Sequence, residues 1–176
     1  MLFGLWRIAR ARKAVTAALQ PMVRASEVRC GTISGRCWTD PYIIGFLSML
    51  ITLMTRSLAS DRLSDDGLAL LQLDVWAALS GVADTGIGER ILSLSANEDE
   101  AFVEGCRCAA EFHQVWELHP SAQSGPYEEA LFAGHSHESI VDTATVGEGL
   151  IFQENSGPDG VMEEMWVRLF DSHITN

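Results

Sequence analysis

Three histidines and one glutamate are the residues of this chain whose types and spacing are best suited to chemistry. His113 and Glu117 are four residues apart in a segment with helical periodicity, so both side chains lie on one helix edge. His135 and His137 follow in a loop-like stretch that could fold over that edge. Imidazole and carboxylate groups are shared ligands of zinc, iron and manganese, so these four residues form the candidate metal site. Because the same spacing equally makes an ordinary surface pair, we expect no bound metal or other cofactor.

The triplet Asp84-Thr85-Gly86 resembles the active-site loop of aspartic proteases. In those enzymes the loop joins β-strands, whereas here it lies between two segments of helical period, where Asp and Gly are favoured as turn residues. The glycines around it are not followed by the Lys-Ser/Thr pair of a phosphate-binding loop. No G-x-S-x-G sequence is present either. We therefore expect no catalytic residue, and the sequence favours a non-enzymatic protein over an enzyme.

The four cysteines follow neither a disulfide nor a zinc pattern. Cys106 and Cys108 are two apart in a helical segment, so their side chains diverge by roughly 200°. Cys30 and Cys37 are separated by six residues, which is outside the spacing of zinc knuckles. The order of charge, apolar run and cleavage site that marks a secretory signal is missing. We expect reduced thiols and a cytoplasmic protein.

Charge is divided unevenly along the 176 residues. Residues 1–36 carry seven cations and one acid, a charge of +6, whereas the rest of the chain carries −18. An acidic body repels phosphate groups, so nucleic acid is not an expected partner. The basic segment could lie on an acidic surface of its own chain or of a second copy, or be a simple solvated helix. Of the twelve cations eleven are Arg, a bias typical of GC-rich bacterial genomes.

The elements that must position these residues begin with a basic amphipathic helix over residues 1–29. One side of its helical wheel is apolar and includes Leu5, Ile8, Val15 and Leu19. Trp6 lies off this stripe, and Pro21 is expected to end or kink the helix. Such a helix could pack within the chain, dock on another subunit, or lie on an anionic membrane through residues 2–23.

Residues 38–176 are predicted to form an acidic helical domain, one folding unit together with the first segment. Thr39 or Asp40 followed by Pro41 predicts the start of an apolar helix. Its uncharged run over 41–55 is shorter than the ~20 residues that cross a bilayer, which indicates a buried core helix.

Small residues on one side of this helix permit another helix to approach closely. We take them, with the apolar residues of the first helix, as candidates for a subunit interface. The candidates are Leu5, Trp6, Ile8, Val15, Leu19, Gly45, Ser48 and Thr52.

The remaining helical patterns cover residues 65–79, 88–94, 97–119, 124–134 and 159–172. Ser64 and Gly81 are the expected cap and stop of the first of these, and Ser95 or Asn97 caps the third. The pattern fails over 135–160, which is expected to be irregular or a β-hairpin.

Together these patterns predict an all-α, single-domain bundle of five to seven helices. The leading functional hypothesis is a non-enzymatic protein-interaction or regulatory module that acts as a homodimer. The alternatives are a metal- or small-ligand-binding protein using His113, Glu117 and the His135/His137 loop, and a peripheral membrane protein. Nothing in the sequence identifies a substrate, ligand or protein partner.

Overall fold

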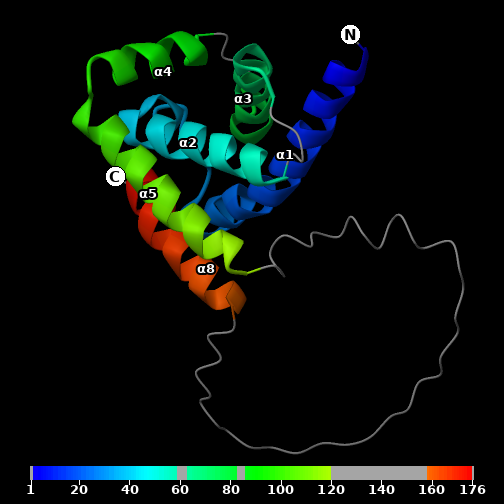
Figure 1. Cartoon of the computed structure of the whole chain (residues 1–176). Coiled ribbons are helices and arrows are strands. Elements are labelled where there is room, and N and C mark those ends of the chain that lie inside the picture. Colours follow the sequence, from blue (N-terminus) through cyan, green and yellow to red (C-terminus); the bar gives the residue numbers. More distant parts are fainter. Residues whose placement is uncertain (1, 59–62, 83–85, 120–157, 176) are drawn as a thin grey trace, which may run out of the picture.

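The computed structural model describes residues 2–58, 63–82, 86–119 and 158–175 (Figure 1). Within these ranges it contains helices and no β-strand, which confirms the predicted all-α class. The longer helices are α1 (Leu2–Cys30), α2 (Pro41–Leu58), α3 (Asp65–Ser80), α4 (Ile87–Ala96), α5 (Glu100–Glu117) and α8 (Pro158–Trp166). The short ones are η1 (Cys37–Thr39), η2 (Val167–Asp171) and α9 (Ser172–Ile174). The predicted helix over 124–134 and the irregular or hairpin segment over 135–160 lie outside the described residues.

Several helix ends are set by the capping residues that the sequence predicts. Asp40 Oδ1 accepts hydrogen bonds from the backbone N–H groups of Tyr42 and Ile43, at 2.9 and 3.2 Å, and so starts α2. Ser64 Oγ accepts the N–H of the third residue of α3 at 3.2 Å. Gly81 ends α3 with φ +70°, a left-handed conformation that glycine adopts without strain.

Of the two expectations for Pro21, an end or a kink of the helix, the end is wrong, because α1 continues through this residue to Cys30. Val15, Leu19 and Val23 are buried on both sides of the proline, so packing holds the helix together across the lost backbone hydrogen bond. The proline ring itself is exposed.

The predicted cap of α5 is also wrong. Neither Ser95 nor Asn97 starts the helix; Asp99 does, with its Oδ1 accepting the N–H of Phe102 at 3.0 Å. The reason lies just upstream, since α4 runs on to Ala96 and Glu98 has φ +50°. This left-handed residue breaks the chain direction and displaces the α5 N-terminus by two residues.

Helix α2 is the centre of the bundle (Figure 1). It is the one helix of the described residues whose length and mean hydropathy of 1.4 would suffice to cross a bilayer, and 61% of it is buried inside the protein. The predicted core helix is therefore found in the core. Its closest neighbour is α5, and the two helices touch at Gly45 and Gly105.

The contact between α2 and α5 is made by backbone against backbone. A Cβ atom on Gly45 would lie 2.2 Å from the carbonyl oxygen of Phe102, and a Cβ on Gly105 would lie 2.2 Å from that of Tyr42. Any side chain at either position would hold the helices apart. The close approach that the small residues predict is thus realised inside this chain.

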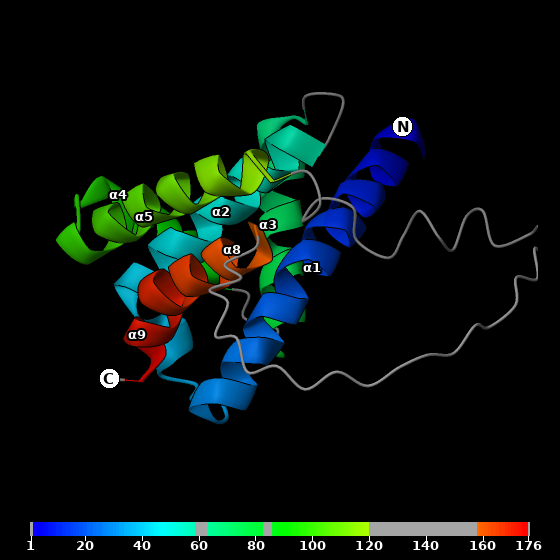
Figure 2. The same ribbon diagram turned by 90° about the horizontal axis from the view of Figure 1, so that it is seen from below.

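Helix α1 crosses α3 and α2 on the side of the bundle away from α5 (Figure 2). The middle of its apolar stripe is used there, since Ala11, Val15, Leu19 and Val23 are buried. At the other end of the molecule, α8 and η2 pack an aromatic cluster against α2 and α5. The cluster consists of Phe46, Phe112, Trp166 and Phe170, with ring centroids 4.6–6.3 Å apart.

A buried polar network fastens α1 to the C-terminal helices. The Ser26 hydroxyl donates to Asp171 Oδ1 and accepts the indole N–H of Trp166 at 2.8 Å. Arg29 Nε donates to Asp171 Oδ2 at 2.7 Å, so the carboxylate is paired on both oxygens. Asp171 is 5% exposed, and burying its charge is tolerable only because these partners compensate it.

The network depends on a local departure from α-helical geometry. Residues of η2 form a π-helix, which shifts the hydrogen-bond register of the C-terminal helix. The carbonyl oxygen of Leu169 within it accepts the hydroxyl of Tyr42 at 2.8 Å. The predicted helix over 159–172 is therefore present, but with a π-turn that periodicity did not indicate.

We expect Gly105→Ala to lower the free energy of unfolding by about 2 kcal/mol or more, because the new Cβ meets backbone atoms that cannot rotate away. Gly160→Ala is the matched control, since a Cβ there meets nothing within 4 Å. The control should gain up to about 1 kcal/mol from helix propensity. Urea unfolding of both variants measures the difference, and equal midpoints would contradict the proposed close contact.

Asp171→Ala should cost about 2–4 kcal/mol, because Arg29 and Ser26 lose their shared acceptor. Arg12→Ala is the comparison, since its ion pair with Asp74 at 3.2 Å is half exposed on both sides. That change should cost less than about 1 kcal/mol. Thermal or urea unfolding tests this order, and a larger loss for Arg12→Ala would overturn the assignment of the main tether to Asp171.

Candidate functional site

The structure brings His113 and Glu117 together with Ser57, a residue that the sequence did not single out. Ser57 lies at the end of α2 and the other two lie on α5. Ser57 Oγ is 3.0 Å from His113 Nε2 and 2.7 Å from Glu117 Oε1, while the imidazole and carboxylate are 3.8 Å apart. His113 is buried and Glu117 is exposed, so the group sits at the surface with its imidazole inside.

Proton bookkeeping fixes the direction of these hydrogen bonds. Ser57 has one hydroxyl proton, and Ser57 Oγ donates it to Glu117 Oε1. The remaining contact is then a donation from His113 Nε2–H to Ser57 Oγ. In a nucleophilic triad the imidazole must accept the serine proton instead, and the acid must contact the imidazole. The three side chains therefore form a chain of hydrogen bonds at the surface, from His113 to Ser57 to Glu117. Its direction is opposite to that of a Ser-His-acid triad, in which serine donates to histidine.

Burial keeps the other candidate groups neutral. Removal from water lowers the pKa of His113, and the nearby Glu117 carboxylate offsets this only in part. Burial likewise raises the pKa of the Cys106 and Cys108 thiols, which disfavours the reactive thiolate. The four cysteines are free, with Cys106 directed to the Gly45 carbonyl at 3.5 Å and Cys108 to Glu104 at 3.6 Å.

The candidate metal site is described only in part. His135 and His137 lie outside the described residues, as do Asp84 and Thr85 of the protease-like triplet. In the part of the chain that the structure does describe, no three His, Cys, Asp or Glu side chains gather closely enough to hold a metal ion. What remains of the predicted set is the pair His113 and Glu117, which share Ser57.

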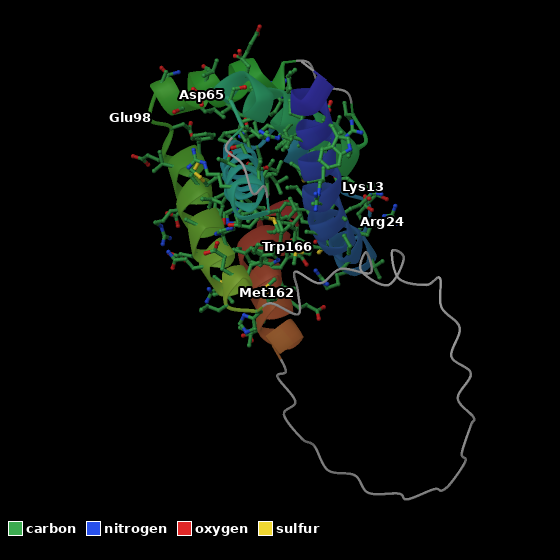
Figure 3. The ribbon with its side chains drawn as sticks, turned by 45° about the vertical axis from the view of Figure 1, so that its right-hand side comes forward. Lys13, Arg24, Asp65, Glu98, Met162 and Trp166 are labelled. Atoms are coloured by element: carbon green, nitrogen blue, oxygen red, sulfur yellow. The ribbon has the colours of Figure 1, made fainter. Side chains whose placement is uncertain are left out.

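The second candidate is the outer side of α1. We call Arg7, Arg10, Lys13 and Arg24 the cationic face; all four are exposed. Figure 3 shows Lys13 and Arg24 along the outer edge of α1, away from the interior position of Trp166. Trp6 is 62% exposed beside this face, with the Arg10 guanidinium 5.7 Å from its ring centroid.

Other cations of α1 meet acids of the same chain. Arg12 pairs with Asp74 of α3, and Arg29 pairs with Asp171 and also with Glu163 of α8 at 3.1 Å. Part of the basic segment therefore lies on the acidic body of its own chain, one of the three arrangements considered from the charge distribution.

Most of the predicted interface residues are used inside the chain. Val15 and Leu19 are fully buried, and Gly45 and Ser48 are covered by neighbouring helices. Others are half-buried: Ile8, which packs on the N-terminal turn of α3, and Thr52, which accepts the Gln72 amide at 2.7 Å. Among the predicted interface residues whose side chains the structure describes, Trp6 is the exposed one. The side chain of Leu5 is not among those described.

Comparison with known proteins gives no guidance on function. No protein-family model matches the chain, and neither a curated protein nor a solved structure matches it. The functional argument therefore rests on the geometry of the candidate sites.

Sequence reasoning missed the polar residues that tertiary packing brings together. Ser57 is 56 residues from His113, and Ser26 is 145 residues from Asp171. A serine within a helix carries no signal of a partner so distant in sequence. A weak hint existed only for Asp171, an acid directly after the apolar pair Leu169 and Phe170.

Because folding lowers the pKa of His113, the neutral form stabilises the native state. This contribution is present above the ordinary histidine pKa and is lost as the pH falls from about 7 to 5. We expect His113→Gln to flatten the loss of stability over this window, measured by urea unfolding at several pH values. Burial also lowers the pKa of His173. The variant His173→Gln is therefore measured over the same pH range for comparison. An NMR titration showing a raised pKa for His113 would contradict this account.

Proposed function

We propose that this chain is a non-enzymatic helical interaction module that forms homodimers through the cationic face of α1 and an acidic surface of a second copy. The observation that carries the proposal is the division of α1. The middle of its apolar stripe, Ala11, Val15, Leu19 and Val23, is buried in its own bundle, while its cationic face is exposed on a chain whose net charge is −12.

The acidic surface lies on other elements of the molecule. Exposed acids at the starts of α3 and α5 and on α4 include Asp65, Asp66, Glu89, Glu98 and Glu100. Figure 3 shows Asp65 and Glu98 in the upper part of the view and Lys13 and Arg24 along the edge of α1; Asp65 belongs to the first turn of α3, which packs on Ile8 of α1. A two-fold dimer can satisfy both surfaces twice, since each copy offers the same pair.

Overall repulsion between two acidic copies does not prevent such contact. Charges farther apart than the Debye length, about 8 Å at physiological salt, are largely screened. Local pairing of opposite charges therefore decides the association and its orientation. The exposed Trp6 beside Arg10 supplies the aromatic and Arg residue types that are enriched in protein interfaces.

The two alternative functions have weaker support from the geometry. A helix that binds a membrane surface inserts its apolar face, and the described apolar stripe of α1 is already covered by α2 and α3. A metal site would start from His113 and Glu117, whose described side chains are hydrogen-bonded to Ser57.

Light scattering over roughly micromolar to near-millimolar concentration should give the mass of a dimer. Arg10→Glu with Arg24→Glu should raise the dissociation constant about ten-fold or more, the equivalent of about 1.4 kcal/mol of lost ionic contact. Both side chains are exposed, so the double variant should fold normally.

Arg36→Glu with Arg168→Glu is the matched control, because it makes the same change in net charge at exposed sites outside α1. This control should dimerise like the unmodified chain. A monomer at every concentration would overturn the proposal. Equal dissociation of both double variants would show that net charge, and no particular surface, controls association.

A further inference from the structure

A cavity of about 180 Å³ lies between α2, α3 and α4, away from both sites described above. Its walls are mostly aliphatic and include Ile51, Leu73, Ile87 and Ile91, with the indole of Trp76 as the aromatic wall. It opens to solvent beside Leu92, whose side chain lines it and is nevertheless 72% exposed. An apolar cavity of about 150 Å³ in another protein is known to hold one benzene ring, so this one has room for a slightly larger molecule.

The aromatic wall is held in a fixed position. Trp76 is 2% exposed and packs edge-on against Trp38, with ring centroids 5.8 Å apart and an interplanar angle of 78°. The cavity is therefore preformed on this side, and a ligand need not order the indole as it binds.

The polar part of the lining offers acceptors. Gln72 Nε2 donates to the Ser48 carbonyl at 3.2 Å and to Thr52 Oγ1 at 2.7 Å, which fixes the orientation of the amide. Its Oε1 receives no hydrogen bond from the described residues and stays available as an acceptor. The Ser48 hydroxyl donates to the Gly45 carbonyl at 3.3 Å, so its oxygen can also accept. No charged side chain belongs to the described lining.

The geometry points to a binding site for a small neutral aromatic molecule that carries one N–H or O–H donor, with the ring between Trp76 and the aliphatic walls and the donor on Gln72. A charged ligand would enter without a compensating charge, which is costly in such surroundings. A donor-free ring would leave the Gln72 acceptor covered and unpaired. None of its lining residues belongs to the cationic face of α1, although Gly88 is next to Glu89 of the proposed acidic surface, so the dimer mass is measured alongside ligand binding.

Indole and toluene are the probes, the first with an N–H donor and the second without one. Titration calorimetry of the full chain should show saturable one-to-one binding of indole with Kd on the order of 0.1–1 mM. Toluene should bind three- to ten-fold more weakly. Changes in the NMR signals of the Gln72 side-chain amide and the Trp76 indole should accompany saturation.

Gly88→Leu tests the location of the ligand. Gly88 lines the cavity, and a Cβ there meets nothing within 4 Å, so leucine can fill the space without a clash. The variant should bind indole at least ten-fold more weakly. Gly160→Leu is the matched control, because a Cβ there also meets nothing within 4 Å and the residue lies on α8, far from the lining. The control should bind like the unmodified chain.

Gln72→Met tests the donor requirement separately. It should reduce indole binding to the level of toluene and leave toluene binding unchanged, which also shows that the cavity is still folded. Absence of saturable indole binding, or equal binding by Gly88→Leu, would overturn the site. A Gly88→Leu protein that loses its dimer mass would assign the cavity to a subunit contact instead. A chain that is monomeric but binds indole would overturn the proposed dimer and leave this site intact.

Discussion

The direct contact of two helix backbones at Gly45 and Gly105 is the constraint on which the rest of the structure depends. With no side chain between them, α2 and α5 lie close enough for residues at their ends to meet, which is how Ser57 reaches His113. The same contact sets the groove in which Phe46 and Phe112 receive Trp166. Because neither glycine can accept a side chain, the distance between the two helices is set by backbone atoms and allows little adjustment.

Around α2 and α5, charged side chains are found in two environments, one buried and one exposed. Inside, Asp171 is held by Arg29 and Ser26, and each of its oxygens has a donor. Outside, the cationic face of α1 is exposed on a molecule that is acidic elsewhere. The inner pairing fixes how α1 lies on the bundle, and this in turn decides which cations are left at the surface. The stability of the fold and the proposed surface of association are therefore linked through one helix.

Local signals predicted a large part of this structure, since the helical class, the Asp40 and Ser64 caps and the Gly81 stop all depend on neighbouring residues. Where packing overrides local preference, the prediction failed, as at Pro21. The candidate site was predicted only where its residues share a helix, as His113 and Glu117 do. Ser57 and the cavity beside Gln72 come from contacts between helices, and no spacing within one segment encodes them. The π-turn of η2 leaves the apolar periodicity nearly unchanged, so it too is invisible in the pattern.

The pairing of Ser26 with Asp171 spans 145 residues and has a consequence for how the protein is made. At a ribosomal rate of about 5–20 residues per second, roughly 7–30 s separate the appearance of these two residues. During that interval Arg29 lacks its acid partners Asp171 and Glu163, and the Ser26 hydroxyl has the Met22 carbonyl of its own helix, 3.1 Å away, as its acceptor. Docking of this end of α1 must therefore follow the synthesis of η2, so it is a late step in the assembly of the described helices.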